Sequence, residues 1–291
     1  MNFVSFGKKV LLGGCFCAFS TLLSDSIADV KQHFDDVLLV VNYNHPHYQS
    51  IDFLKKMYGI AFSHIVFYGE KDDSRVYTIN HHEGHYGYRA LADAMRRHPH
   101  FRGYLYTNDD CFLNFWQLIR CAKNKLWVIP PYANLALNDQ ARPRRLEGDG
   151  RGWTWWYREC GYKAAKNVYT QLSEKNKRLL LHNCGASSLC YGFSDLVYIP
   201  REYAQEVQEL CAVCSTQGLF LEIALPMICA SVAPKEEREN FNALISWYKP
   251  QEEVLGRYTL KYHAIHPLKF SDEKVRTFIE QRVEQLVAAL R

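Results

Sequence analysis

The sequence predicts an α/β fold, a single domain with a mainly parallel, mixed central sheet flanked by helices. Short β-branched segments alternate with segments of helical periodicity in the first third of the chain, which is typical of strand–helix–strand units with right-handed crossovers. The chain has 291 residues, 48% hydrophobic and 23% charged, enough to bury a sizeable core and too apolar for a disordered protein. No internal repeat or low-complexity linker divides it, so we expect one domain at residues 29–291.

The individual elements are predicted from apolar periodicity and from the residues that interrupt it. Residues 37–41, VLLVV, form a continuous apolar run typical of a strand buried on both faces. We expect further strands at 64–68, 76–79, 103–107, 126–129, within 186–199 and at 258–266. We expect helices at 48–58, 86–97, 112–119, 161–177, 203–214 and 219–232, and from 272 onward. Residues 141–158 are basic, Trp-rich and interrupted by glycine, which favours a functional loop or lid.

The charge balance argues against one class of partner. The sequence holds 35 Lys and Arg residues against 31 Asp and Glu residues, a formal net charge of +4, and it has no long basic run. Nucleic-acid binding needs concentrated positive charge, so we expect no nucleic-acid partner.

The N-terminus has the pattern of a targeting segment. Lys8 and Lys9 precede an apolar run at residues 10–23, and Ser26-Ile27-Ala28 supplies small residues for cleavage before Asp29. We therefore expect residues 1–28 to be a signal peptide or a short signal anchor, and the protein to enter the secretory pathway and be secreted, periplasmic or lumenal. Membrane association would then come only from an uncleaved N-terminal segment. A cytosolic apolar helix is the alternative.

Cysteine usage agrees with that expectation. Ten cysteines are present, and eight follow residue 28. This even number fits an oxidising compartment, although spacing does not reveal the pairing. Cys211 and Cys214 have redox spacing, but they lie in an apolar helical pattern, so we expect core positions or one half of a disulfide.

An acidic turn follows the predicted strand at residues 103–107. Asn108, Asp109 and Asp110 end the strand abruptly. Two adjacent carboxylates just past a core strand are costly if they are buried without a counter-ion. A divalent cation would relieve that cost, and Mn²⁺ or Mg²⁺ takes oxygen ligands from one or two carboxylates and completes its shell with substrate phosphates. The alternative is a solvated turn, because Asn and Asp are common turn residues.

A second polar motif lies near the C-terminus. His266-Pro267-Leu268-Lys269 follows a predicted strand, and Pro267 favours an extended conformation at His266. A neutral imidazole can bind Mn²⁺, and a lysine ammonium suits phosphate oxygens. In isolation this motif is equally compatible with a surface loop.

Taken together, a buried first strand, a helix before an acidic turn at a strand end, and a late His-Pro-x-Lys resemble the GT-A glycosyltransferase fold over residues 37–269. The resemblance implies one Rossmann-like domain that holds a nucleotide-sugar through a divalent metal. Asp110 would be the chelating acid of a DxD-type motif, and Asp109 would touch metal, ribose or sugar. Asn108 stands where the first Asp is usual, and His266 would be the late metal ligand. Lys269 would contact the diphosphate.

The same resemblance places the donor against the first strands. The nucleoside would lie at Asn42, Tyr43 and Asn44, and against Glu70 or Asp72. Arg89 would face the diphosphate; the alternative is a solvated helix face on which Arg89 pairs with Asp93 at i, i+4 spacing. We expect His81, His82, His85 and Tyr86 to be loop residues near that site.

An inverting transfer also needs a carboxylate base for the acceptor hydroxyl. Glu222 is a lone acid in an apolar helical run, where burial would raise its pKa toward a useful range. The alternative for Glu222 is a structural acid at a helix end, and Asp195 is the second candidate base. Trp153, Trp155 and Trp156 suit a sugar-stacking acceptor platform, with core filling as the alternative.

These observations predict metal-dependent transfer of a sugar from a nucleotide-sugar donor to a glycan, protein or lipid acceptor. A nucleotidyltransferase on the same architecture would also use a metal but would attack the α-phosphate. A non-catalytic carbohydrate- or nucleotide-binding relative is a third hypothesis, which the amide at position 108 keeps open.

Overall fold

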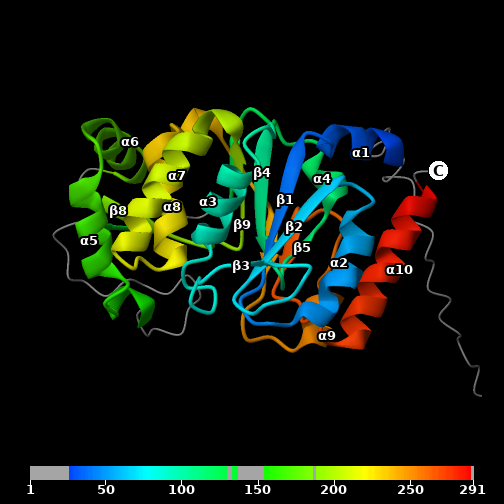
Figure 1. Cartoon of the computed structure of the whole chain (residues 1–291). Coiled ribbons are helices and arrows are strands. Elements are labelled where there is room, and N and C mark those ends of the chain that lie inside the picture. The colour runs from blue at the N-terminus through cyan, green and yellow to red at the C-terminus, as the bar shows by residue number, and fades with distance from the viewer. Residues whose placement is uncertain (1–25, 130–132, 137–153, 186–187, 290–291) are drawn as a thin grey trace, which may run out of the picture.

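The computed structural model describes residues 26–129, 133–136, 154–185 and 188–289. Within these residues the chain forms a central seven-stranded sheet with helices on both faces, which confirms the predicted α/β class (Figure 1). Trp153 and most of the expected lid at 141–158 lie outside the described residues.

The elements follow one another without long irregular stretches between them. The strands are β1 (Val37–Asn42), β2 (His64–Gly69), β3 (Tyr77–Thr78), β4 (Gly103–Asn108), β5 (Phe112–Leu113), β6 (Leu126–Val128), β7 (Ala133–Ala136), β8 (Ser188–Tyr191), β9 (Leu196–Pro200), β10 (Arg238–Asn240), β11 (Ala243–Ile245) and β12 (Ala264–His266). The α-helices are α1 (Ile27–Phe34), α2 (Ile51–Tyr58), α3 (Tyr88–Arg97), α4 (Phe115–Leu118), α5 (Tyr162–Gln171), α6 (Glu174–Cys184), α7 (Arg201–Thr216), α8 (Leu221–Val232), α9 (Gln251–Gly256) and α10 (Glu273–Ala289). Short 3₁₀ turns are η1 (Tyr48–Ser50), η2 (Thr154–Tyr157) and η3 (Lys235–Glu237).

The strand order of the main sheet is β10-β6-β9-β4-β1-β2-β3. Strands β1, β2, β3 and β4 run parallel, whereas β9 runs antiparallel to both β4 and β6. The chain leaves β1 toward β2 and β3 on one side and then returns to pair β4 on the other side. The sheet therefore has a topological switch point between β1 and β4, where α/β proteins characteristically bind ligands.

Strand β1 is buried on both faces, as its continuous apolar sequence predicts. Leu38 and Val40 pack into a core that includes α3, α7 and α8, whereas Leu39 and Val41 pack into a second core that includes α1, α2 and α10. The two groups of helices lie on opposite sides of the sheet (Figure 1). Burial of each such side chain stabilises the fold by about 1.5–3 kcal/mol, which fixes the position of the strand end that carries the site.

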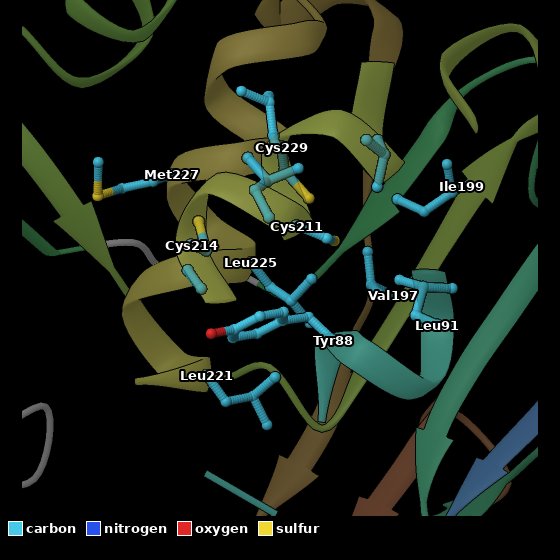
Figure 2. Packing of buried hydrophobic residues seen from close by; sticks show 14 of the residues in the cluster. Tyr88, Leu91, Val197, Ile199, Cys211, Cys214, Leu221, Leu225, Met227 and Cys229 are labelled. Carbon is cyan, nitrogen blue, oxygen red and sulfur yellow. The ribbon is translucent and has the colours of Figure 1, made fainter. Parts of the chain in front are cut away.

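The first core contains the cysteines with redox spacing. Cys211 and Cys214 on α7 lie with Cys229 of α8 among apolar side chains, and the Tyr88 hydroxyl of α3 donates to the Leu219 carbonyl oxygen at 2.9 Å (Figure 2). This confirms the core alternative for residues 211–214. No disulfide joins the cysteines within the described part of the chain.

Several element boundaries differ from the sequence prediction. The expected helix at 161–177 is two helices, because Leu172 is extended and the Ser173 side chain caps α6 by accepting a hydrogen bond from the Asn176 N–H. The expected helix at 112–119 begins instead as β5, which pairs with β12. Of the strand expected at 258–266, only residues 264–266 are extended in a sheet.

Helix α1 was not expected and lies at the predicted processing boundary. Ser26 caps it, and the side chains of Ser26 and Asp29 form a reciprocal capping box. Cleavage between Ala28 and Asp29 would therefore remove the cap and the first residues of this helix. Residues 1–25 lie outside the described part of the chain. Among the residues that are described, no helix has the length and apolar character needed to span a membrane.

Candidate active site

The site begins where β1 and β4 end side by side. Asn42 and Asn108 are partners in the parallel register of these strands, and the Asp109 N–H donates to the Asn42 carbonyl oxygen at 2.9 Å. The Asn44 N–H lies 3.3 Å from Oδ1 of Asp109. The acidic turn therefore lies at the switch point of the sheet, because the backbone of the two strands holds it there.

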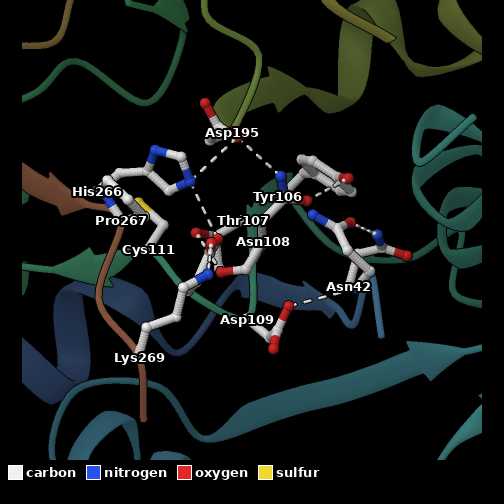
Figure 3. Close-up of polar contacts among 12 residues, drawn as sticks. Asn42, Tyr106, Thr107, Asn108, Asp109, Cys111, Asp195, His266, Pro267 and Lys269 are labelled. Atoms are coloured by element: carbon white, nitrogen blue, oxygen red, sulfur yellow. Dashed lines mark hydrogen bonds and ion pairs between the residues drawn. The ribbon is translucent and has the colours of Figure 1, made fainter. Parts of the chain in front are cut away.

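The late His-Pro-x-Lys segment reaches this turn through sheet pairing. Strand β12 runs antiparallel to β5, which directly follows the acidic turn, and the Leu268 N–H donates to the Asp110 carbonyl oxygen at 2.7 Å. Nε2 of His266 lies 3.0 Å from Oδ1 of Asp110, and Nζ of Lys269 lies 3.5 Å from Oδ2 of the same carboxylate (Figure 3). The structure thus brings the two predicted motifs into direct contact.

Asp195 joins the cluster from a third strand. Strand β9 pairs antiparallel with β4, so the residue before β9 lies at the same edge as the residue that ends β4. Nδ2 of Asn108 donates to Oδ1 of Asp195 at 2.9 Å, and His266 Nε2 lies 3.4 Å from the same oxygen. Tyr106 completes the arrangement by donating its hydroxyl to Oδ1 of Asn108 at 2.8 Å (Figure 3). Sequence reasoning treated Asp195 chiefly as a turn residue and did not single out Tyr106.

Glu222 lies in the first turn of α8, next to the same cluster. Its side chain is partly buried, and burial together with the Asp195 carboxylate raises its pKa to about 8. His266 is its nearest cationic influence. A carboxyl group with this pKa has the protonation behaviour that a base working near neutral pH requires.

The protonation states within the cluster are strongly coupled. Burial alone would raise the pKa of Asp110, but His266 and Lys269 hold it at about 2. Burial alone would lower the pKa of His266, but the Asp195 and Asp110 carboxylates raise it to about 9. Burial and the neighbouring Asp110 raise the pKa of Asp109 to about 8. The site therefore gathers more acids than bases, an imbalance that a divalent cation would relieve.

The donor set fits Mn²⁺ or Mg²⁺. Asp110 and His266 present a carboxylate and an imidazole side by side, and Oδ2 of Asp195 is buried without a hydrogen-bond partner in the described residues. Within those residues no three His, Cys, Asp or Glu side chains converge on a ready-made metal geometry. Mg²⁺ and Mn²⁺ commonly take few protein ligands and complete their shells with phosphate oxygens and water, so this donor set is sufficient in kind.

The residues expected at the nucleoside differ in how available they are. Asn42 is buried and its Nδ2 donates to Oδ1 of Asn44 at 3.0 Å. The Tyr43 ring is 1% exposed and its hydroxyl lies 2.8 Å from Oγ of Ser50, so only its backbone could reach a ligand. Asp72 is exposed and accepts a hydrogen bond from the Thr78 hydroxyl.

Glu70 and Arg89 are engaged by neighbouring protein groups. Burial would raise the pKa of Glu70, but hydrogen bonds from the backbone of residues 81–83 lower it, so this carboxylate holds the loop after β3. The Arg89 guanidinium donates to Oγ of Ser215 and to the Asn80 carbonyl oxygen, each at 2.8 Å. Asp93 interacts with Arg96 and Arg97, so the alternative pairing expected between Arg89 and Asp93 is not the one formed.

A cleft of about 530 Å³ lies on the other side of the loop of residues 81–87. It is lined by His82, His85, Tyr86, Trp155, Arg158, Glu159, Cys160, Lys163, Ala164, Asn167, Gln217 and Gly218. The loop separates this cleft from the nucleoside side, because Gly84 packs so closely on Asn44 that a Cβ there would lie 2.2 Å from its Oδ1. The Leu221 N–H donates to the His85 carbonyl oxygen at 2.8 Å, so the cleft wall is tied to the start of α8, immediately before Glu222.

The expected tryptophan platform is not formed as predicted. Trp156 is 2% exposed and packs against Tyr162 and Tyr191, so it belongs to the core. Trp155 does line the cleft, but its ring stacks on Phe220 with centroids 4.4 Å apart, and the Arg158 guanidinium lies 4.2 Å from its centre. The ring faces that a sugar would need are therefore occupied by protein groups.

Comparisons with known proteins bear on the class of reaction. No protein-family model matches the sequence. The chain is 23% identical over 252 residues to "Probable glycosyltransferase STELLO2" of Arabidopsis thaliana, and 22% identical over 253 residues to "Probable glycosyltransferase STELLO1" of the same plant. Each match covers 84% of this chain but only 31% of the relative. These distant relatives support glycosyl transfer as the class of activity, with a donor and an acceptor as substrates.

Proposed function

We propose that this protein transfers a sugar from a nucleotide-sugar donor to a carbohydrate-bearing acceptor with the help of Mn²⁺ or Mg²⁺. The observation that carries the proposal is the contact between Asp110 and His266 at the switch point of the sheet. It joins an anionic and an imidazole ligand beside a lysine, which is the donor set that a metal–diphosphate complex needs. The distant glycosyltransferase relatives support the same class of reaction.

The donor would bind along the ends of β1 and β4. In this proposal Asp110 and His266 hold the cation, Lys269 contacts the diphosphate, and Asp109 faces the ribose or sugar. The nucleoside lies against Asn42, Asn44 and the backbone of residue 43, with Glu70 and Asp72 at the rim. When bound, the cation would stabilise the negative charge that develops on the leaving diphosphate. Lys269 supports that charge directly, because its side chain is 60% exposed and free to approach a phosphate.

Glu222 is the proposed base for an inverting transfer. Its carboxylate would take the proton of the acceptor hydroxyl while that oxygen attacks the anomeric carbon. The bond between this carbon and the diphosphate oxygen breaks in the same step, and its electron pair leaves with the diphosphate. Asp195 is the second candidate, but its Oδ1 is already paired with Asn108 and faces His266.

The acceptor is assigned to the cleft beside the loop of residues 81–87. This cleft ends at the residues that precede Glu222, so an acceptor seated in it could present a hydroxyl to that side chain. Its lining is rich in polar groups, including Arg158, Lys163 and Asn167. Since the face of Trp155 is covered, the acceptor would be held by hydrogen bonds and charge rather than by stacking on that ring.

A product assay tests this proposal against its nearest rival. Purified protein is incubated with a panel of nucleotide-sugars and glycan acceptors, with Mn²⁺ or with a chelator, and the released nucleotide is identified by mass spectrometry. Glycosyl transfer predicts metal-dependent release of a nucleoside diphosphate and a matching gain of one sugar on the acceptor. Nucleotidyl transfer would instead start from a nucleoside triphosphate and release pyrophosphate. Binding of donors without turnover under every condition would favour a non-catalytic relative.

A further inference from the structure

We propose that Asp195 supplies the second carboxylate of the cation site, and that Asn108 is a positioning residue that holds Asp195 there. This inference rests on the proposed metal-dependent function and concerns which side chains serve it. It replaces a direct role of Asn108 toward the metal with an indirect one. It also accounts for an amide at the position where the motif usually has its first acid.

Both ends of the Asn108 amide are already committed. Oδ1 accepts the hydroxyl hydrogen of Tyr106 at 2.8 Å, and Nδ2 donates to Oδ1 of Asp195 at 2.9 Å. Because a tyrosine hydroxyl on one side and a carboxylate on the other require an acceptor and a donor respectively, the amide orientation is fixed by its neighbours. An aspartate at position 108 could not donate to Asp195 and would place two carboxylates in contact.

Asp195 has the unused coordination capacity that Asn108 lacks. Its side chain is 7% exposed, and its Oδ2 is buried with no hydrogen-bond partner in the described residues. A buried carboxylate oxygen left without a partner costs free energy, which a cation would offset. Oδ1 of Asp195 lies 3.4 Å from His266 Nε2, and Oδ1 of Asp110 lies 3.0 Å from the same nitrogen. The imidazole thus marks a point that both carboxylates face.

Strand topology explains how the two acids meet. Asp110 follows β4 at its carboxyl end, whereas Asp195 precedes β9, which is antiparallel to β4. The Asn108 N–H donates to the Asp195 carbonyl oxygen at 3.1 Å, so the backbone as well as the amide side chain holds residue 195 at this edge. The pair of acids that a DxD-type motif supplies from one turn would here come from two strands.

Titration of Mn²⁺ in the presence of UDP, followed by electron paramagnetic resonance of the free ion, tests the inference without measuring turnover. Asp195→Asn should weaken Mn²⁺ binding at least about tenfold, because the amide keeps the shape but lacks the charge. It should do so in the wild-type protein and also in a His266→Ala background. Asn108→Ala should weaken binding in the wild-type protein but add nothing to Asp195→Asn, since it acts through that residue.

Three outcomes would overturn the inference. Unchanged Mn²⁺ affinity in Asp195→Asn would remove Asp195 as a ligand. Loss of its effect in the His266→Ala background would make it only an orienting partner of His266. A full additional loss from Asn108→Ala in the Asp195→Asn protein would restore Asn108 as a direct ligand. If Asp110→Ala also leaves Mn²⁺ binding unchanged, the proposed metal site itself fails, which is a separate result.

A measurement on the wild-type protein covers the case in which Asp195→Asn does not fold. Fe²⁺ substituted for Mn²⁺ in the UDP complex, with ascorbate and peroxide, cleaves the backbone next to the bound ion. The inference predicts cleavage near residues 110, 195 and 266, and the fragments can be identified by mass spectrometry. Cleavage near 110 and 266 without any near 195 would contradict it.

Discussion

His266 and Asp110 lie 156 positions apart in the sequence, and Nε2 of His266 is 3.0 Å from Oδ1 of Asp110. The contact depends on β12 pairing with β5, which directly follows the acidic turn. Around it stand Asp195, Glu222 and Lys269, each delivered by a different part of the chain. The predictions below test what this arrangement does and which residues only support the fold.

Glu222→Gln tests the proposed base. The amide keeps the shape and hydrogen-bonding capacity of the side chain but cannot take the acceptor's proton, so turnover should fall by about 10²- to 10⁴-fold. Donor affinity should barely change, because the diphosphate is held by other residues. The measurement is the transfer rate at saturating donor and acceptor, alongside donor affinity and a thermal melt. Retained turnover would remove Glu222 from the mechanism and make Asp195 the next candidate.

The raised pKa of Glu222 also predicts a pH dependence of stability in protein freed of metal by a chelator. The ordinary pKa is 4.5, and burial raises it to about 8 in the folded state. The folded protein therefore binds this proton more tightly than the unfolded chain does. Its stabilising effect is complete below the ordinary pKa and is lost as pH rises through about 8.

Urea denaturation of the wild type and of Glu222→Gln at pH 5, 7 and 9 measures this effect. The wild type should lose stability relative to the variant as the pH rises over this range, because Gln has no proton to lose. A constant difference between the two proteins across the range would show that burial does not perturb Glu222.

Lys163→Ala tests the acceptor cleft. Lys163 lines the cleft, whereas Lys166, on the same helix α5, lies against the Tyr162 ring and is not part of the lining. Loss of a polar contact to the acceptor should raise the acceptor KM several-fold, by about the 0.5–1.5 kcal/mol of a typical hydrogen bond, and leave donor affinity unchanged. Lys166→Ala is the matched control and should match the wild type. Equal acceptor KM values in all three proteins would place the acceptor elsewhere.

Trp156→Ala and Tyr157→Ala separate core filling from ligand binding. Trp156 is buried, whereas the adjacent Tyr157 is 51% exposed. Removal of a buried tryptophan should lower the free energy of unfolding by about 3–5 kcal/mol. The exposed tyrosine should change it by about 0.5 kcal/mol or less. Denaturant titration of both variants decides the matter, and a fully stable Trp156→Ala protein would contradict the core assignment.

The parts of the fold that local sequence patterns determine were predictable. The apolar runs of β1 and β4 and the helix periodicity between them carry the parallel half of the sheet, because a strand buried on both faces has no polar positions. They also place Asp109 and Asp110 at a strand end. Helix α1 and the break between α5 and α6 were not predicted, since each depends on a single capping serine rather than on periodicity.

The composition of the site could be predicted only in part. Asp110, His266 and Lys269 were expected together through a family resemblance, and the structure brings them into contact. The position of Asp195 depends on the antiparallel register of β9 against β4, which no local pattern reveals. The covered ring of Trp155 was likewise hidden, because its partner Phe220 lies far along the chain.

Calorimetric titration of UDP and GDP, with Mn²⁺ and with a chelator, tests the central claim most directly. The proposed site predicts nucleotide binding that needs Mn²⁺, is lost in Asp110→Ala, and is weakened less in His266→Ala because water can replace one neutral ligand. Asp52→Ala, which changes a surface acid of α2 that is 79% exposed, is the control and should bind like the wild type. Unchanged Mn²⁺-dependent affinity in a folded Asp110→Ala protein would contradict the assignment of the metal–diphosphate site.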